Sequence, residues 1–359
     1  MRLGDPTLAT LARALDGDAD ALGTLAHAPE RIKGHRIASA LAARARAVGV
    51  ELPAAWQQTR YRAAAHHLLL DAALSGAARE LERAGVSFAP IKGSDLAHRI
   101  YASPDERPSG DVDLLIDAAG FEAARQGLLD AGWRAVTDDP LTERYLRDEG
   151  YAWQATGRDD VLLELHVRLW GMVPEALGAS LLNEASDAPD IASTARRLTL
   201  AGAFVLAAVH TWLEPPPRPM LRWWELERLC AHGEKTEHDL VTPVLELCER
   251  FDLSFPVGLA CRVSATLWPR NETLITLASR LEESYAWSER RVLAHADRSG
   301  IERTPLGSIV LARLLAGRDS RAGWRSVWRR LWPHPAIVAR ATPNTWTWPR
   351  RRAASLWQG

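Results

Sequence analysis

Asp111 and Asp113 are the residues whose type and spacing are best suited to chemistry. They are separated by one residue in the apolar run 111–116, which predicts a β-strand. Because side chains alternate between the two faces of a strand, both carboxylates point the same way. Two anions so close repel each other and need a cation, and a hard divalent ion such as Mg²⁺ suits oxygen ligands. The alternative is an exposed pair at a strand end, partnered by arginine.

The turn Lys92-Gly93-Ser94 predicts a place for phosphate. It follows the apolar run 86–91, a second expected strand, and opens a helix. Glycine lets a phosphate approach the backbone, and the start of a helix offers free N–H groups. Lys92 adds a positive charge. The alternative is an ordinary strand-to-helix turn. The motif is informative mainly because it lies one strand before the aspartates.

Glu164 is a charged residue in the middle of a third apolar run, 161–166. A carboxylate there is costly unless it has a partner, and convergence on the same metal ions would explain it. His166 lies on the same face of this expected strand. It either contacts a phosphate, orients a ligand, or is a structural histidine at a strand end.

Arg107 lies in the segment 105–110 that leads directly into Asp111. A guanidinium so close to the carboxylates has two interpretations. It neutralises the charge of a bound phosphate, or it pairs with the carboxylates themselves.

The expected elements that position these residues fall into three parts. Residues 1–84 are helical, residues 85–190 form an α/β module, and residues 191–359 are helical again. From about residue 194 onward we expect no strands, and the proline-rich segment 214–219 predicts a loop. Within the module the expected strands are 86–91, 111–116 and 161–166, and the expected helices are Asp95–Tyr101 and Phe121–Ala131, the latter ended by Gly132.

Composition describes an ordinary globular protein of 359 residues, with 47% hydrophobic and 25% charged residues. The net charge of −1 argues against a polycation that binds nucleic acid through bulk charge. No run of residues predicts a signal peptide or a transmembrane segment, so we expect a cytoplasmic protein. The sequence does not indicate an oligomeric state.

Several cysteines and histidines are better explained by structure than by metal binding. The three cysteines fit no zinc signature and are expected to be buried thiols in a reducing compartment. Adjacent histidines on a helix point about 100° apart, so His66 and His67 do not form a metal pair. The spacing of His232 and His238 is not a zinc pattern either. Phosphate loops of the Walker type and Rossmann glycine fingerprints are absent from the sequence.

The segment 318–359 is rich in arginine and tryptophan. Trp324, Trp328 and Trp332 recur every four residues, which predicts one face of a helix. The first interpretation is a C-terminal helix that packs its tryptophans on the core. The others are a surface for RNA or another anionic substrate, or attachment to a membrane surface.

Taken together, these motifs resemble the DNA polymerase β-like nucleotidyltransferase superfamily, and most closely its largely uncharacterised bacterial branch. The resemblance covers about residues 60–230 and is most specific over 91–116. In that branch Ser94 is often alanine, and Glu225 stands where aspartate is usual. The motifs that carry it are Ile91-Lys92-Gly93, Arg107–Ile116, Glu164-Leu165-His166, Val209-His210 and Leu221–Leu226.

The resemblance implies an α+β fold, with an α/β-type core on a small mixed sheet flanked by N-terminal and C-terminal helical regions. It also implies that two Mg²⁺ ions bridge the carboxylates and the triphosphate of ATP or another NTP. An acceptor hydroxyl then attacks the α-phosphate and pyrophosphate leaves. Asp111, Asp113 and Glu164 would hold the metals and act in catalysis, and Lys92, Gly93, Ser94, Arg107 and His166 would bind the nucleotide.

Three functions are compatible with these residues. The first is a nucleotidyltransferase acting on a small molecule or peptide, as the biosynthetic settings of the branch suggest; RNA is a less favoured acceptor. The second is a non-catalytic nucleotide- or partner-binding protein on the same fold. The third is a phosphotransferase that uses the same carboxylates to pass the γ-phosphate.

Overall fold

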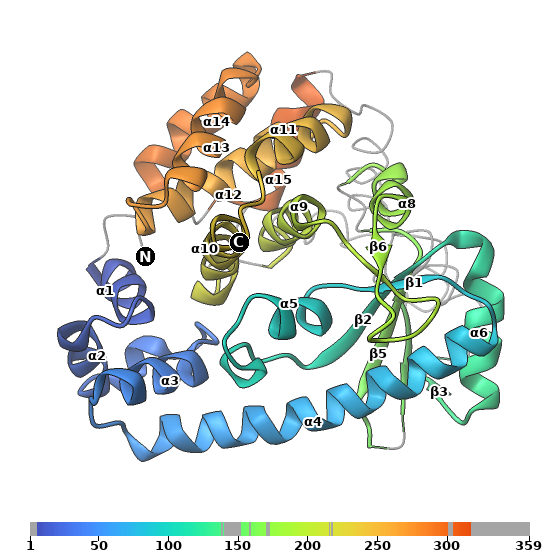
Figure 1. The fold of residues 1–359 in the computed structure, drawn as a ribbon. Coiled ribbons are helices and arrows are strands. Elements are labelled where there is room, and N and C mark those ends of the chain that lie inside the picture. The colour runs from blue at the N-terminus through green and yellow to red at the C-terminus, as the bar shows by residue number, and fades with distance from the viewer. Residues whose placement is uncertain are drawn as a thin grey trace, which may run out of the picture.

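A computed structural model describes residues 6–137, 139, 152–157, 159–169, 173–214, 216, 218–300 and 304–316. A small sheet lies at one side of the molecule, and helices surround it (Figure 1). The described helices are α1 Pro6–Leu15, α2 Ala19–Ala26, α3 Ala38–Val48, α4 Ala54–Arg83, α5 Gly93–Arg99, α6 Phe121–Asp130, α8 Ala176–Asn183, α9 Leu200–Thr211, α10 Met220–Lys235, α11 Val241–Arg250, α12 Ser254–Leu267, α13 Glu272–Glu283, α14 Trp287–Ser299 and α15 Leu306–Leu315, with short 3₁₀ turns η1 Pro29–Ile32, η2 Pro104–Glu106 and η3 Ala118–Gly120.

The main sheet has five strands and is mixed. Its order is β1-β2-β5-β4-β3, with β2 and β5 parallel and the other neighbours antiparallel. A separate two-stranded sheet pairs β6 with β7. The strands are β1 Phe88–Pro90, β2 Asp111–Ile116, β3 Arg134–Ala135, β4 Trp153–Thr156, β5 Leu162–His166, β6 Ser186–Asp187 and β7 Arg196–Arg197.

The two faces of β2 face different cores. Val112, Leu114 and Ile116 are buried together with side chains of α4 and α6. Leu115 is buried on the opposite face, in a core that also contains side chains of the N-terminal helices and of α9 to α15. The aspartates share this second face, so the helices that follow the sheet in sequence can reach them.

The N-terminal and C-terminal helices are joined through this second core. Leu11 of α1, Leu41 of α3 and Trp223 of α10 all belong to it and are essentially inaccessible to solvent. The helix α4 extends from the N-terminal helices to the sheet and passes beneath both (Figure 1). Helices from both ends of the described chain therefore pack together on one side of the sheet.

The fold is α+β, as the sequence predicts, but the sheet is larger than expected. The strand over 111–116 is confirmed at both ends, and the expected strands 86–91 and 161–166 are present in shorter form. Strands β3, β4 and β6 were not predicted. The expectation that strands end before residue 194 is wrong for β7, a two-residue strand too short to leave a periodic pattern.

In the described part of the chain, no helix combines the length and the apolar character needed to span a membrane. The 30-residue helix α4 is long enough, but it carries charged residues throughout. The predicted Trp-rich helix around residues 324–332 lies outside the described residues.

Candidate functional site

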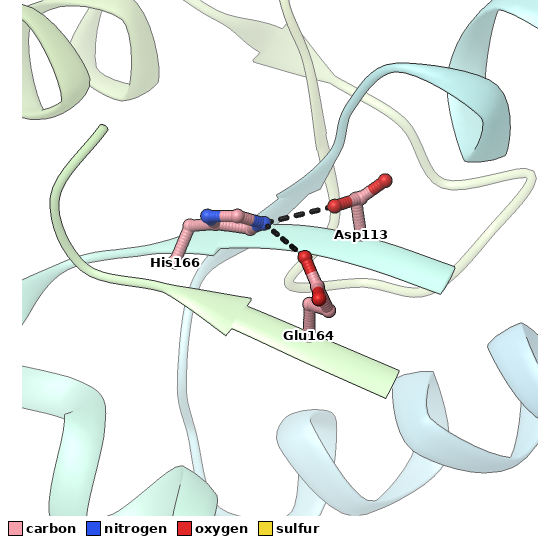
Figure 2. Close-up of side chains that lie close together, drawn as sticks. All are labelled: Asp113, Glu164 and His166. Atoms are coloured by element: carbon pink, nitrogen blue, oxygen red, sulfur yellow. Dashed lines mark hydrogen bonds and ion pairs between the residues drawn. The ribbon is translucent and has the colours of Figure 1, made fainter. Parts of the chain in front are cut away.

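The parallel pairing of β2 with β5 places the predicted site residues side by side. Asp113 lies directly opposite Glu164, and Leu115 lies opposite His166. Because alternate residues of a strand share a face, Asp111, Asp113, Glu164 and His166 all lie on one side of the sheet. Figure 2 shows the last three converging. The sheet thus brings together two carboxylates and an imidazole from two strands, with Asp113 and His166 53 positions apart in sequence.

His166 connects the two carboxylates. Its Nε2 lies 2.8 Å from Asp113 Oδ1 and 3.3 Å from Glu164 Oε2 (Figure 2). Since a carboxylate accepts, Nε2 carries the proton and donates to Asp113. One ligand atom from each of Asp113, Glu164 and His166 lies within 4.8 Å of the others, an arrangement that could hold a metal ion. Among the described residues, His166 Nδ1 is buried without a hydrogen-bond partner.

Lys92 directs its ammonium group into the same cluster. Its Nζ lies 2.6 Å from Asp113 Oδ1 and 3.9 Å from Glu164 Oε2, and its side chain is 12% exposed. Lys92 precedes α5 with φ at 52° and ψ at −124°, a conformation that is unfavourable for a residue with a side chain. The strained turn therefore positions the lysine beside the carboxylates.

The pKa values of the two aspartates are shifted in opposite directions. Burial alone would raise the pKa of Asp113, but Lys92 and His166 hold it well below its ordinary range. Burial and the neighbouring charge of Asp113 raise the pKa of Asp111, against the opposing effect of Lys92. Burial and Lys92 act to lower the pKa of His166, yet its hydrogen bonds to Asp113 and Glu164 raise it. Asp113 is therefore the firmly ionised centre of the cluster.

Asp111 is the first residue of β2 and lies on the same face of the strand as Asp113. Its side chain is partly exposed and forms no hydrogen bond or ion pair with another described residue. It is also not one of the three residues whose ligand atoms lie within 4.8 Å of one another. The metal-binding role predicted for Asp111 therefore stays a prediction.

A hydrogen bond joins the turn after β1 to β2. The backbone N–H of Asp113 donates to Ser94 Oγ at 3.0 Å. A Cβ atom on Gly93 would collide with Ser109 Oγ and with the guanidinium of Arg107. Packing alone therefore requires glycine at position 93, and the predicted contacts of Gly93 and Ser94 with phosphate stay a prediction.

Arg107 pairs with a residue that the sequence analysis did not include in the site. Its guanidinium lies 2.6 Å from Glu225 of α10. It forms no ion pair with Asp111 or Asp113 in the described structure. His67 Nε2 donates to the backbone oxygen of Arg107 at 2.8 Å, which agrees with a structural role for His67. Two signals pointed to Glu225: it is an acidic residue within the apolar segment 223–226, and it stands where the resembled branch usually has aspartate.

A small cavity lies beside Lys92 on the side facing α9 and α10. Its lining includes Arg107, His210, Arg222 and Glu225. Burial, together with Arg222 and Lys92, lowers the pKa of His210 well below its ordinary value. Glu225 stays ionised because Arg107 and Arg222 lower its pKa against the effect of burial. The helical region thus contributes charged groups next to the cluster.

The cysteines confirm the expectation of buried free thiols. All three are buried and unpaired in disulfides. Burial raises the pKa of Cys248 by removing the thiolate from solvent, so this thiol is inert at neutral pH. They contribute nothing to the metal-binding group found among the described residues.

Comparison with known proteins places these residues in a family context. A family model described as an uncharacterised nucleotidyltransferase matches residues 25–224, more than half of the 359-residue chain. The matched range contains every site residue predicted from the sequence. A search of curated proteins found no match.

Proposed function

The chain belongs to the uncharacterised nucleotidyltransferase family, and on this premise we propose that it transfers a nucleoside monophosphate from an NTP, with ATP the expected donor. The acceptor is a hydroxyl or phosphate group on a small molecule or peptide. The observation that carries the proposal is the convergence of Asp113, Glu164 and His166 beside Asp111. The proposal includes membership of the DNA polymerase β-like superfamily and a cytoplasmic setting.

The residues of the cluster fit a hard divalent ion. Asp113 is held ionised, and the partly exposed side chains of Asp111 and Glu164 offer further oxygen atoms. Mg²⁺ prefers such oxygen ligands and keeps several waters. We propose that these three carboxylates hold Mg²⁺, two ions in the complex with the triphosphate. When bound, the ions would neutralise the phosphate charge and align the attacking and leaving oxygens.

The protein's own groups supply the remaining requirements of the reaction. Lys92 lies beside the carboxylates and would bind phosphate oxygens, together with Arg107 and the turn at Gly93 and Ser94. The acceptor oxygen forms a bond to the α-phosphorus while the bond to the β-phosphate oxygen breaks, and pyrophosphate leaves. Glu164 would accept the acceptor's proton, since its carboxylate is 16% exposed and faces the cluster.

His166 would act by positioning the carboxylates. Its Nε2–H bonds Asp113 at 2.8 Å and reaches Glu164 at 3.3 Å. A donor shared between two carboxylates fixes both in the orientation that ligands of a metal need. The sequence predicts that His166 contacts the nucleotide. In this proposal His166 instead orients the two carboxylates.

The proposal is tested first by binding. The thermal midpoint of unfolding is measured with each NTP in the presence and absence of Mg²⁺. We expect a rise that requires both, because the ion and triphosphate bind only the folded chain. Absence of a shift with any nucleotide would contradict the proposal and favour a protein that binds a different partner on this fold.

The second test separates the chemistries. Asp113→Asn removes the central carboxylate, and Asp117→Asn is the matched control because Asp117 is exposed just beyond the end of β2. We expect transfer from an α-labelled NTP to be lost in the first variant and kept in the second. The mass of the product then distinguishes a nucleoside monophosphate adduct from the phosphate adduct of a phosphotransferase.

A further inference from the structure

A single oxygen atom of Asp113 accepts two strong donors. Lys92 Nζ lies 2.6 Å from Oδ1, and His166 Nε2 lies 2.8 Å from the same atom. A carboxylate oxygen has two lone pairs that lie in its plane, so these donors occupy Oδ1 fully. A cation could bind this atom only after one donor has left. The other oxygen, Oδ2, forms no hydrogen bond with another described residue.

The fold holds Lys92 beside Asp113 in an unfavourable backbone conformation. Its backbone has a positive φ, one of only five such non-glycine positions in the described residues. Its long side chain is 12% exposed, and its ammonium group is also 3.9 Å from Glu164. A lysine that only attracted phosphate from solution would not need this burial or this contact with Asp113. The geometry makes the ammonium group a cation of the cluster itself.

The charges of the cluster leave room for one divalent ion. With its three carboxylates ionised and Lys92 protonated, the cluster of Asp111, Asp113, Glu164 and Lys92 has a net charge of −2. One divalent ion neutralises this charge. Two would leave an excess of positive charge at a partly buried site, which is costly until a triphosphate arrives.

We propose that Lys92 fills the place of one cation in the nucleotide-free protein, so that the free chain binds a single divalent ion. Glu164 and the free oxygen of Asp113 would hold that ion, with Asp111 as a further carboxylate on the same face of the sheet. Lys92 would leave Asp113 for the phosphates of a bound NTP, and Asp113 would then have room for a second ion. The inference rests on the proposed metal-dependent function and specifies how that site is loaded.

The first experiment counts ions without using activity. Mn²⁺ binding to the nucleotide-free chain is measured by calorimetry and by electron paramagnetic resonance. We expect one ion per chain, and spectra of paired, spin-coupled ions only after a non-hydrolysable ATP analogue is added. Two ions, or paired spectra, in the absence of nucleotide would overturn the inference while leaving the proposed function intact.

The second experiment removes the lysine. In nucleotide-free Lys92→Met, we expect either a second Mn²⁺ site or at least about tenfold tighter binding of the first ion, since a positive charge within a few ångströms is lost. Lys235→Met is the matched control, because Lys235 is exposed in the last turn of α10. A folded Lys92→Met variant with the Mn²⁺ count and affinity of the unchanged chain would overturn the inference.

The outcomes distinguish failure of the inference from failure of the function. If the unchanged chain binds no Mn²⁺ either alone or with the ATP analogue, the proposed function fails and the inference fails with it. If Lys92→Met does not fold, as judged by circular dichroism, the count and the spectra of the unchanged chain still decide. One ion alone and a coupled pair with nucleotide support the inference.

Discussion

The guanidinium of Arg107 lies 2.6 Å from the carboxylate of Glu225, and the two side chains are only 4% and 2% exposed. Arg107 precedes β2, whereas Glu225 belongs to α10. Arg222 also reaches Glu225, at 3.3 Å, and binds Glu214 at 2.5 Å. This buried network fixes the C-terminal helices to the loop that leads into Asp111. The site is therefore supported from both the sheet and the helical region.

Glu225→Gln should lower the free energy of unfolding by roughly 3–5 kcal/mol. Removal of one member of a buried ion pair leaves the other charge desolvated and uncompensated. Here Arg107 would lose its charged partner, while Arg222 would keep Glu214. Urea denaturation followed by circular dichroism measures the loss.

Two further variants in α10 serve as controls for Glu225→Gln. Glu225→Asp keeps the charge at a shorter reach and should cost less than Glu225→Gln. Glu234→Gln removes an exposed carboxylate and should change stability by less than about 0.5 kcal/mol. Equal stability of Glu225→Gln and the unchanged chain would show that the network contributes little.

Gly93→Ala should destabilise the turn after β1 by about 1–3 kcal/mol, because its methyl group would overlap Ser109 and Arg107. Nucleotide affinity should fall as well, since the turn carries Lys92. The control is Gly110→Ala, where a Cβ would meet no atom within 4 Å. Differential scanning calorimetry with and without Mg-ATP checks both effects, and equal behaviour of the two variants would contradict the packing argument.

Asp111→Asn and Asp113→Asn should have opposite effects on the stability of the metal-free protein. Burial and repulsion from Asp113 raise the pKa of Asp111, so removing its charge should stabilise the fold by about 1 kcal/mol. Asp113→Asn should destabilise it, because Lys92 would lose its closest anion. Chemical denaturation in the presence of a chelator measures both. Destabilisation by Asp111→Asn would contradict this division of roles.

Much of the core could be predicted from sequence because its elements have strong local patterns. The run 111–116 is apolar apart from its two aspartates, and it forms β2 with those bounds. Strand β4 went unpredicted because it is short and alternates between buried and partly exposed residues. Its position beside β5 is fixed by pairing with Glu164 and its neighbours, which no local pattern reveals.

The site was predictable as a set of residues but not as an arrangement. Residue type and spacing identified Asp113, Glu164 and Lys92. The register that places Asp113 opposite Glu164 depends on the parallel pairing of two distant strands. The Arg107–Glu225 pair joins residues 118 positions apart. Such long-range contacts are decided by packing of the whole chain rather than by local propensity.

Glu227 makes the stability of the protein depend on pH. Burial, with help from Asp16 and Glu234, raises the pKa of Glu227 to about 7 against the effects of Arg228 and Arg44. One oxygen of Glu227 is buried without a hydrogen-bond partner among the described residues. Between the ordinary pKa of 4.5 and about 7, the folded chain binds a proton that the unfolded chain does not. The free energy of unfolding should therefore fall as pH rises through this range, by at most about 3 kcal/mol.

Glu227→Gln should remove this pH dependence. The variant should be about as stable as the unchanged chain at pH 5, where the folded protein already carries a neutral carboxyl group. At pH 8 it should be more stable by about 1–3 kcal/mol, because no charge has to be buried. Urea midpoints at the two pH values measure the difference, with Glu249→Gln as the control at an exposed position of α11. If Glu227→Gln instead lost stability at pH 8, the carboxylate would be a paired anion rather than a desolvated one, and Arg228 or Arg44 would be its partner.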